Sequence, residues 1–139
     1  MSRGMSDVFE RVVWMLFDTD VLIWYLRGNE KASDSLKDAD RRHISVVSYM
    51  ELLQGVRDKK EVKVIRSFIS ELDFEMLPLT ENIGHRALVY MEEYCLKIDM
   101  CLADALLAAT AVENRITLCT GNKKHYAPLA EIELSIFRP

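Results

Sequence analysis

Three carboxylates and one amide stand beside apolar segments of this 139-residue chain. Asp18 directly follows an apolar run, Asn122 comes just after a second one, and Glu51 and Asp104 lie near the starts of helical segments. Three carboxylates gathered at one place would repel one another unless a divalent cation neutralised them. Carboxylates are hard oxygen ligands that suit Mg²⁺ or Mn²⁺. We therefore expect Asp18, Glu51 and Asp104 to be both catalytic and metal-binding, with Asn122 as a fourth catalytic residue.

A cation held by these residues could activate a water for in-line attack on a phosphodiester bond. None of the three histidines is placed to act as the general base in place of the metal ion. His43 opens an expected strand, His85 lies within a long expected helix, and only His125 falls near the polar residues. The metal ion must then generate the nucleophile.

The elements that position these residues alternate between strand and helix. Apolar or β-branched runs predict strands at 12–17, 43–47, 74–77 and 116–119, with a possible fifth at 132–137. Amphipathic or alanine-rich segments predict helices at 21–26, 29–38, 49–56, 60–72, 80–97 and 102–114. Such alternation favours a three-layer α/β/α fold around a parallel sheet of four to five strands. Because parallel sheets bind ligands at the carboxyl ends of their strands, the four residues should meet there.

Structural roles compete with chemistry at two of the candidate ligands. Asp18 could be a turn carboxylate that caps the next helix, although its place at a strand end favours ligation. Glu51 lies three residues after Ser48, which is the spacing of a capping box, so the two interpretations of Glu51 are evenly matched.

The other polar residues differ in how strongly they indicate a site. Asp104 lies among Leu102, Ala105 and Leu106, where an uncompensated charge is costly, so metal ligation explains it better than a helix-dipole contact does. Asp20 is expected mainly as a helix N-cap, and alternatively it supports the metal ligands from behind, as Thr120 could. Asn122 is most often a loop or cap residue.

The composition fits one compact domain. The chain is 50% hydrophobic, and no linker-like segment or repeat divides it. No apolar run is long enough to span a bilayer. Cys95, Cys101 and Cys119 are odd in number and lack CxxC spacing, so neither a disulfide framework nor a structural zinc site is indicated, and the expected location is the reducing cytoplasm.

The charge balance is acidic, but two short segments are basic. The net charge of −4 and pI near 5.4 do not suggest a general nucleic-acid binder. A solvated helix face is the simpler interpretation of any one basic run. An acidic centre flanked by basic segments nevertheless suits a phosphate backbone, and the possible RNA contacts are Lys59, Lys60, Lys63, Lys123 and Lys124.

Taken together, the motifs resemble those of the PIN domain, and within it the VapC-type toxins of toxin–antitoxin systems. The resemblance covers about 16–137 and rests on four segments in order: Leu16-Phe17-Asp18-Thr19-Asp20, Ser48-Tyr49-Met50-Glu51-Leu52, Ala103-Asp104-Ala105-Leu106 and Thr120-Gly121-Asn122-Lys123-Lys124-His125-Tyr126. Residues 15–139 would form the domain. Residues 1–14 would be an N-terminal extension or a misassigned start, since Met15 directly precedes the first motif.

The resemblance implies an Mg²⁺- or Mn²⁺-dependent endoribonuclease that cleaves single-stranded or structured RNA. It also implies a cognate antitoxin that inhibits the enzyme by entering the site, and a homodimer. Some relatives carry an aspartate at or near 122–125, where this chain has Asn122 and His125, so one well-bound ion is expected rather than two. Two alternatives remain: a haloacid-dehalogenase-like phosphatase using Asp18, and a non-catalytic module that binds RNA or ribosomes.

Overall fold

A single parallel sheet forms the centre of the molecule. The structure, a computed structural model, describes residues 12–139, so most of the expected N-terminal extension lies outside the described residues. Within 12–139 the strand order is β3-β2-β1-β4-β5, and every pairing is parallel. The strands are β1 (Trp14–Phe17), β2 (Arg41–Ser45), β3 (Glu75–Leu77), β4 (Thr117–Thr120) and β5 (Leu134–Ile136). The expected sheet is confirmed, including its fifth strand.

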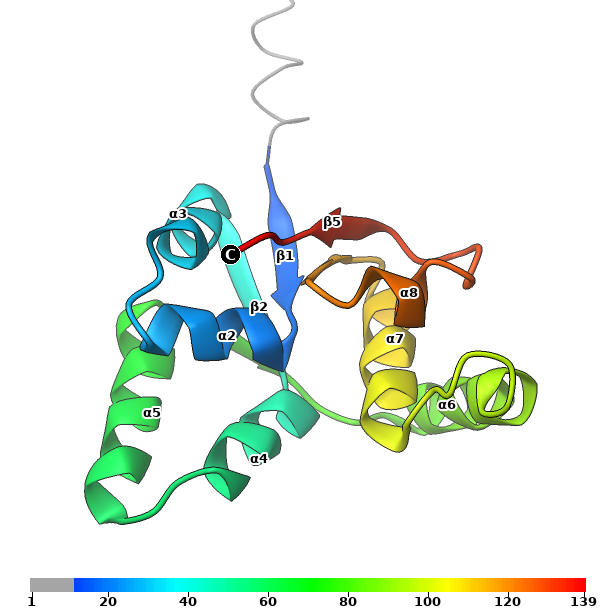
Figure 1. Cartoon of the computed structure of the whole chain (residues 1–139), viewed down its shortest axis with the longest axis horizontal. Helices are drawn as coiled ribbons and strands as arrows, with labels where there is room; N and C mark the ends of the chain where they lie inside the picture. The colour runs from blue at the N-terminus through cyan, green and yellow to red at the C-terminus, as the bar shows by residue number, and fades with distance from the viewer. Residues whose placement is uncertain (1–11) are drawn as a thin grey trace, which may run out of the picture.

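Helices cover both faces of this sheet, which confirms the three-layer fold (Figure 1). The side chain of Phe17 packs with α2, α3, α4 and α5, whereas its neighbour Leu16 packs with α6, α7 and α8 on the opposite face. Alternate residues of a strand point to opposite faces, so a continuous apolar run is needed where both faces are covered. The helices are α2 (Thr19–Leu26), α3 (Glu30–Asp38), α4 (Val46–Gln54), α5 (Lys59–Glu71), α6 (Glu81–Tyr94), α7 (Leu102–Asn114) and α8 (Lys123–Tyr126).

The register of the central strands places two of the sequence motifs side by side. Phe17 of β1 is paired with Cys119 of β4, and the backbone N–H of Asp18 donates to the Cys119 carbonyl at 2.9 Å. The first polar residue after β1 therefore lies beside Thr120, the last residue of β4. The carboxyl ends of the two strands open on the same edge of the sheet.

The start of α4 differs from its expected position. Strand β2 begins at Arg41, two residues before the expected start, because Arg41 and Arg42 pair with Trp14 and Met15 of β1. The helix that follows then begins at Val46 with Ser45 as its N-cap, and the Ser45 hydroxyl accepts from the Val47 N–H. The predicted capping box of Ser48 with Glu51 is therefore wrong, since Ser48 is buried within the helix.

The start of α2 also corrects a prediction. The helix begins at Thr19, directly after the strand, so Asp18 is its N-cap and Asp20 lies inside the first turn. The expectation that Asp20 is mainly an N-cap is wrong. Its carboxylate is free to accept a bond from elsewhere in the chain, as described below.

Candidate acidic active site

Asp18 is a buried carboxylate held by groups from both central strands. Its side chain is only 7% exposed. One oxygen, Oδ1, accepts from the Thr19 N–H at 2.7 Å, and the other, Oδ2, accepts from the Thr120 hydroxyl at 2.7 Å. The Asp18 carboxylate is therefore fixed in one orientation at the carboxyl edge of the sheet.

Tyr126 joins Asp18 to Asp104. The tyrosine is fully buried, although it belongs to the short helix α8. Its hydroxyl donates to Asp104 Oδ1 at 3.1 Å and lies 3.4 Å from Asp18 Oδ2. Asp104, in the first turn of α7, is thereby brought to the same place as Asp18.

Asp20 links the first turn of α2 to the loop after β4. Its Oδ2 accepts from the Gly121 N–H at 3.0 Å. A Cβ at position 121 would lie 2.7 Å from that same oxygen, which is closer than Cβ atoms approach oxygen in proteins. Glycine is thus required here for the close approach of Asp20 to the backbone.

The Glu51 side chain bonds Thr19, the residue next to Asp18, rather than Asp18 itself. Its Oε1 accepts from the Thr19 hydroxyl at 2.7 Å, and Thr19 is the residue that follows Asp18. Glu51 is exposed, whereas Thr19 is buried. The glutamate therefore lies at the rim of the site, with its carboxylate open to solvent.

Asn122 and the lysines contribute less to the arrangement. Asn122 is exposed; its backbone N–H donates to the Thr120 hydroxyl, and its side chain does not cap α8. Lys123 and Lys124 are exposed on α8, the helix that carries Tyr126. The other lysines, Lys59, Lys60 and Lys63, are exposed on α5, which lies across the sheet from α8 (Figure 1).

The carboxylates are electrostatically strained. Burial, followed by the charge of Asp20, raises the pKa of Asp18 to about 7, against the lowering effect of its bonds from Thr120 and Thr19; the charge of Asp104 adds to the rise. Burial also raises the pKa of Asp20. The neighbouring hydroxyl of Tyr126 has its pKa raised by burial and by the charge of Asp18, so it remains a proton donor. A bound cation would relieve this strain.

The carboxylate oxygens are suitable ligands for a hard divalent ion, although they do not converge on a single point. Asp18 and Asp104 offer carboxylate oxygens on either side of the Tyr126 hydroxyl, and oxygen is the ligand that Mg²⁺ and Mn²⁺ prefer. Within residues 12–139, no three His, Cys, Asp or Glu side chains are grouped closely enough to hold a metal ion. Glu51, which bonds the hydroxyl of Thr19 next to Asp18, would have to rotate to become a third ligand.

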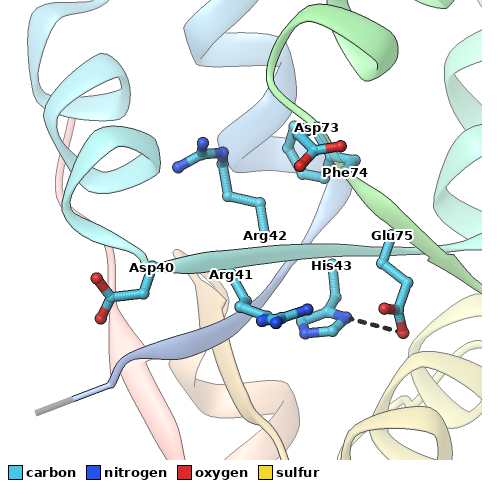
Figure 2. Close-up of a pocket in the computed structure, with 7 residues that line it drawn as sticks. All are labelled: Asp40, Arg41, Arg42, His43, Asp73, Phe74 and Glu75. Carbon is cyan, nitrogen blue, oxygen red and sulfur yellow. Dashed lines mark ion pairs between the residues drawn. The ribbon is translucent and has the colours of Figure 1, made fainter.

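A polar cavity of about 400 Å³ lies where β2 and β3 begin, at the end of the strands opposite to the acidic site (Figure 2). Its residues carry both signs of charge. The Arg42 guanidinium is committed to the backbone carbonyls of Leu36, Ala39 and Leu72. Buried His43, whose pKa is lowered by that burial, has Nδ1 3.7 Å from Glu75 Oε2. No set of like donors converges there, so the acidic edge is the better candidate.

Sequence reasoning found the carboxylates but missed the groups that hold them. Tyr126 belongs to the last of the four motifs, but its contact with the carboxylates could not be predicted. In sequence, a single aromatic residue in a four-residue helix looks the same as a core residue. Thr19, Cys101 and His125 also contact the acidic residues. For His125, proximity to the polar loop was the available signal.

Comparisons with known proteins agree with this geometry. The PIN domain family model matches residues 15–128. Ribonuclease VapC10 of Mycobacterium tuberculosis is 37% identical over 86% of this chain and 90% of its own, and Ribonuclease VapC1 of Methanocaldococcus jannaschii is 30% identical over 88% and 86%. A toxin–antitoxin complex from Klebsiella pneumoniae contains a chain that superposes with a TM-score of 0.69 at 28% identity, covering 85% of this chain and 94% of that one.

The chain therefore belongs to the PIN domain family. Its named relatives within that family are VapC ribonucleases. In the described part of the chain, 12–139, no helix is long and apolar enough to cross a membrane.

Proposed function

We propose that this protein is a divalent-metal-dependent endoribonuclease of the VapC type, kept inactive by a cognate antitoxin. The observation that carries the proposal is the meeting of Asp18 and Asp104 on either side of the Tyr126 hydroxyl, with Asp20 and Glu51 nearby. Family membership argues against the phosphatase alternative. RNA is the proposed substrate because the relatives are named ribonucleases.

The proposed ligands of one Mg²⁺ or Mn²⁺ ion are Asp18, Asp104 and Glu51, of which the last must rotate toward the site. When bound, the ion would activate a water and stabilise the charge that develops on the phosphodiester. The protein's own groups orient the ligands: Thr120 and the Thr19 N–H hold Asp18, and Tyr126 holds Asp104.

The loops around the ligands have two further roles. Asp20 and Gly121 keep the loop after β4 against the first turn of α2, which fixes the position of α8 and hence of Tyr126. On the solvent side of α8, Lys123 and Lys124 provide positive charge for the RNA backbone. We assign a weaker role to Asn122, which is exposed and able to reach a phosphate oxygen without contacting the carboxylates.

The test is cleavage of single-stranded RNA of mixed sequence by the purified protein in EDTA, Mg²⁺ or Mn²⁺. We expect cleavage only with a divalent ion. The Asp18→Asn and Asp104→Asn variants should each lose activity by orders of magnitude, whereas Asp34→Asn, on the exposed side of α3, should match the wild type. Cleavage by Asp104→Asn at the wild-type rate would refute the assignment. Growth arrest retained by Asp18→Asn would instead favour the non-catalytic alternative.

We further propose that the antitoxin binds in a groove between α2, α4 and α5. This groove has a volume of about 660 Å³, with apolar side chains along it and Glu51 among its lining residues. Arg27 also lines it and suits an acidic residue of a bound segment, whereas Arg57 is paired with Glu61. Because Glu51 is shared between groove and site, a segment lying there would reach the proposed metal ligands. An Arg27→Glu substitution should weaken antitoxin binding, measured by calorimetry, while RNA cleavage is retained.

A homodimer in the cytoplasm is the proposed state of the free protein. Early helices carry five apolar residues that favour a dimer, and these are only partly available as a surface: Tyr25, Leu26, Leu52, Leu53 and Val56. Leu52 lies in the core and Tyr25 and Val56 pack against it, while Leu26 is exposed. Light scattering at tens of micromolar tests the dimer, and a monomeric mass would remove it from the proposal.

A further inference from the structure

Three donors of different chemical types meet at one oxygen of Asp104. The Cys101 thiol lies 3.1 Å from Asp104 Oδ2, and His125 Nδ1 lies 3.1 Å from the same atom. Cys101 precedes α7, Asp104 is in its first turn, and His125 comes from α8. The other carboxylate oxygen, Oδ1, accepts the bond from Tyr126. One face of Asp104 thus looks toward Asp18, and the other toward sulfur and nitrogen.

Neither Cys101 nor His125 has another clear structural task. Cys101 is exposed and occupies the N-cap position of α7, but its side chain makes no capping bond. The Nδ1 atom of His125 is buried, and it has no hydrogen-bond partner of good geometry among the described residues. Its closeness to Asp104 is therefore a contact between two potential acceptors or an ion pair, and a cation between them would satisfy both.

We propose that Cys101, Asp104 and His125 form a binding site for a divalent transition-metal ion of the zinc type. Thiolate, imidazole and carboxylate are together the ligands that zinc favours, whereas Mg²⁺ has little affinity for sulfur. The fourth position of a tetrahedral ion is left for water or a phosphate oxygen. This soft-ligand site lies on the side of Asp104 that faces away from Asp18.

The separations of the Cys101 sulfur and His125 Nδ1 from Asp104 Oδ2 are compatible with such a site. Metal bonds of about 2.0 Å to oxygen and nitrogen and about 2.3 Å to sulfur, at tetrahedral angles, place donor atoms roughly 3.3–3.5 Å apart. Both separations from Asp104 Oδ2 are 3.1 Å, within a few tenths of these values. The three donors do not already close around one point in the described part of the chain. The Cys101 side chain is exposed, so it can rotate to close the site.

Binding exchanges a proton for the cation. The Cys101 thiol donates to Asp104 in the metal-free protein, and this proton must leave for solvent when the thiolate ligates the ion. The ion then takes the proton's place between sulfur and oxygen. No bond between heavy atoms is broken and no oxidant is needed.

Sharing of Asp104 gives the site a regulatory consequence, which rests on the proposed function. An ion of the zinc type on the Cys101 side withdraws Asp104 from the proposed magnesium ligands. The enzyme should then lose RNA cleavage in Mg²⁺ when micromolar Zn²⁺ is added. Because binding itself can be measured without RNA, the site and the nuclease can fail separately.

The decisive probe is Co²⁺, which replaces zinc and absorbs in the near ultraviolet when it is bound to thiolate. The full-length protein is titrated with Co²⁺ in a non-thiol reductant, as wild type, Cys101→Ser and Cys95→Ser. Serine is a better N-cap than cysteine, so Cys101→Ser should fold normally, which a thermal melt checks. Cys95 follows α6 and makes no contact with Asp104, so it provides the matched control.

We expect a sulfur-to-cobalt absorption band in the wild type and in Cys95→Ser, and its loss in Cys101→Ser. Zn²⁺ should displace Co²⁺ and bind at least tenfold more weakly to Cys101→Ser and to His125→Asn. Wild-type protein without the band, or Cys101→Ser that retains it, would overturn the proposal. In the RNA assay, Cys101→Ser should resist Zn²⁺ at concentrations that inhibit the wild type. A protein that shows the band but cleaves no RNA would leave the site standing and reject the nuclease.

Discussion

Replacing Asp18 by asparagine should stabilise the metal-free protein, and the gain should depend on pH. The substitution keeps the shape and the acceptor for the Thr19 N–H, but it removes a charge that burial and Asp20 make unfavourable. One hydrogen bond is weakened, because the Thr120 hydroxyl donates to Oδ2 in the wild type and would face an NH₂ group in the variant. The balance between the two effects can be worked out from the pKa of Asp18.

The sign follows from proton binding. The pKa of Asp18 is about 7 in the folded protein and near its ordinary value of 3.8 when unfolded. Between these values the folded state binds more protons, so this group's contribution to the free energy of unfolding falls as pH rises from about 4 to about 7. From this difference in pKa, Asp18 lowers the free energy of unfolding by about 4 kcal/mol at pH 8 and by less than about 2 kcal/mol at pH 5. Subtracting about 1 kcal/mol for the weakened bond leaves the variant about 3 kcal/mol more stable at pH 8 and nearly equal at pH 5.

Urea unfolding in EDTA at pH 5, 6.5 and 8 measures both values, with Asp34→Asn as the control for an exposed aspartate. Added Mn²⁺ should reverse the order at pH 8, because only the wild type retains the charge that binds the ion, and ligand binding stabilises the folded state. A difference between Asp18→Asn and wild type that is constant from pH 5 to pH 8 would refute the electrostatic reasoning. So would a variant that is less stable than the wild type at pH 8 without metal.

Three further predictions concern the groups around the carboxylates. Gly121→Ala should lower the free energy of unfolding by about 2 kcal/mol, since the new Cβ displaces Asp20 from its backbone bond; urea unfolding measures this, and its effect should not add to that of Asp20→Ala. Tyr126→Phe should cost about 1 kcal/mol in the same assay and reduce RNA cleavage, because Asp104 loses its donor. Asp20→Asn keeps only one of the two backbone bonds, from Gly121 and Val21, that the carboxylate accepts; in EDTA at pH 8 the loss of a charge that burial makes unfavourable should offset the lost bond, so the melting temperature should not fall.

Much of the fold could be predicted because its central segments have strong local patterns. The helix 102–114 was predicted with its observed bounds, since an alanine- and leucine-rich segment has few alternatives. The start of α6 was expected at Thr80, which is its N-cap in the structure, and the Thr80 hydroxyl accepts from the Ile83 N–H. Where the pattern was weaker, at the end of α6, the helix stops at Tyr94 rather than near Lys97.

The start of β2 was missed for a physical reason. Arg41 and Arg42 look like a surface turn, since charged residues rarely begin a strand next to the centre of a sheet. In the fold the Arg42 guanidinium donates to three backbone carbonyls, of Leu36, Ala39 and Leu72, at the ends of α3 and α5. Leu72 lies 30 residues away in sequence, so no local pattern could reveal that Arg42 is held between the ends of these two helices. The two-residue error then shifted the expected start of α4 and created the false capping box at Ser48.

In the acidic site, too, the direction of the strands could be predicted from the sequence, whereas the long-range side-chain contacts could not. Parallel strands β1 and β4 place Asp18 next to Thr120 through a backbone bond from Asp18 to Cys119, and the parallel chain direction was the part that could be predicted. The strands do not predict which side chains cover the Asp18 carboxylate, because Tyr126 reaches it from a helix of only four residues. The burial that results raises the pKa of Asp18 and makes a bound cation favourable. The strand order thus determines where the Asp18 carboxylate lies, and the packing of α8 against this carboxylate determines what it can bind.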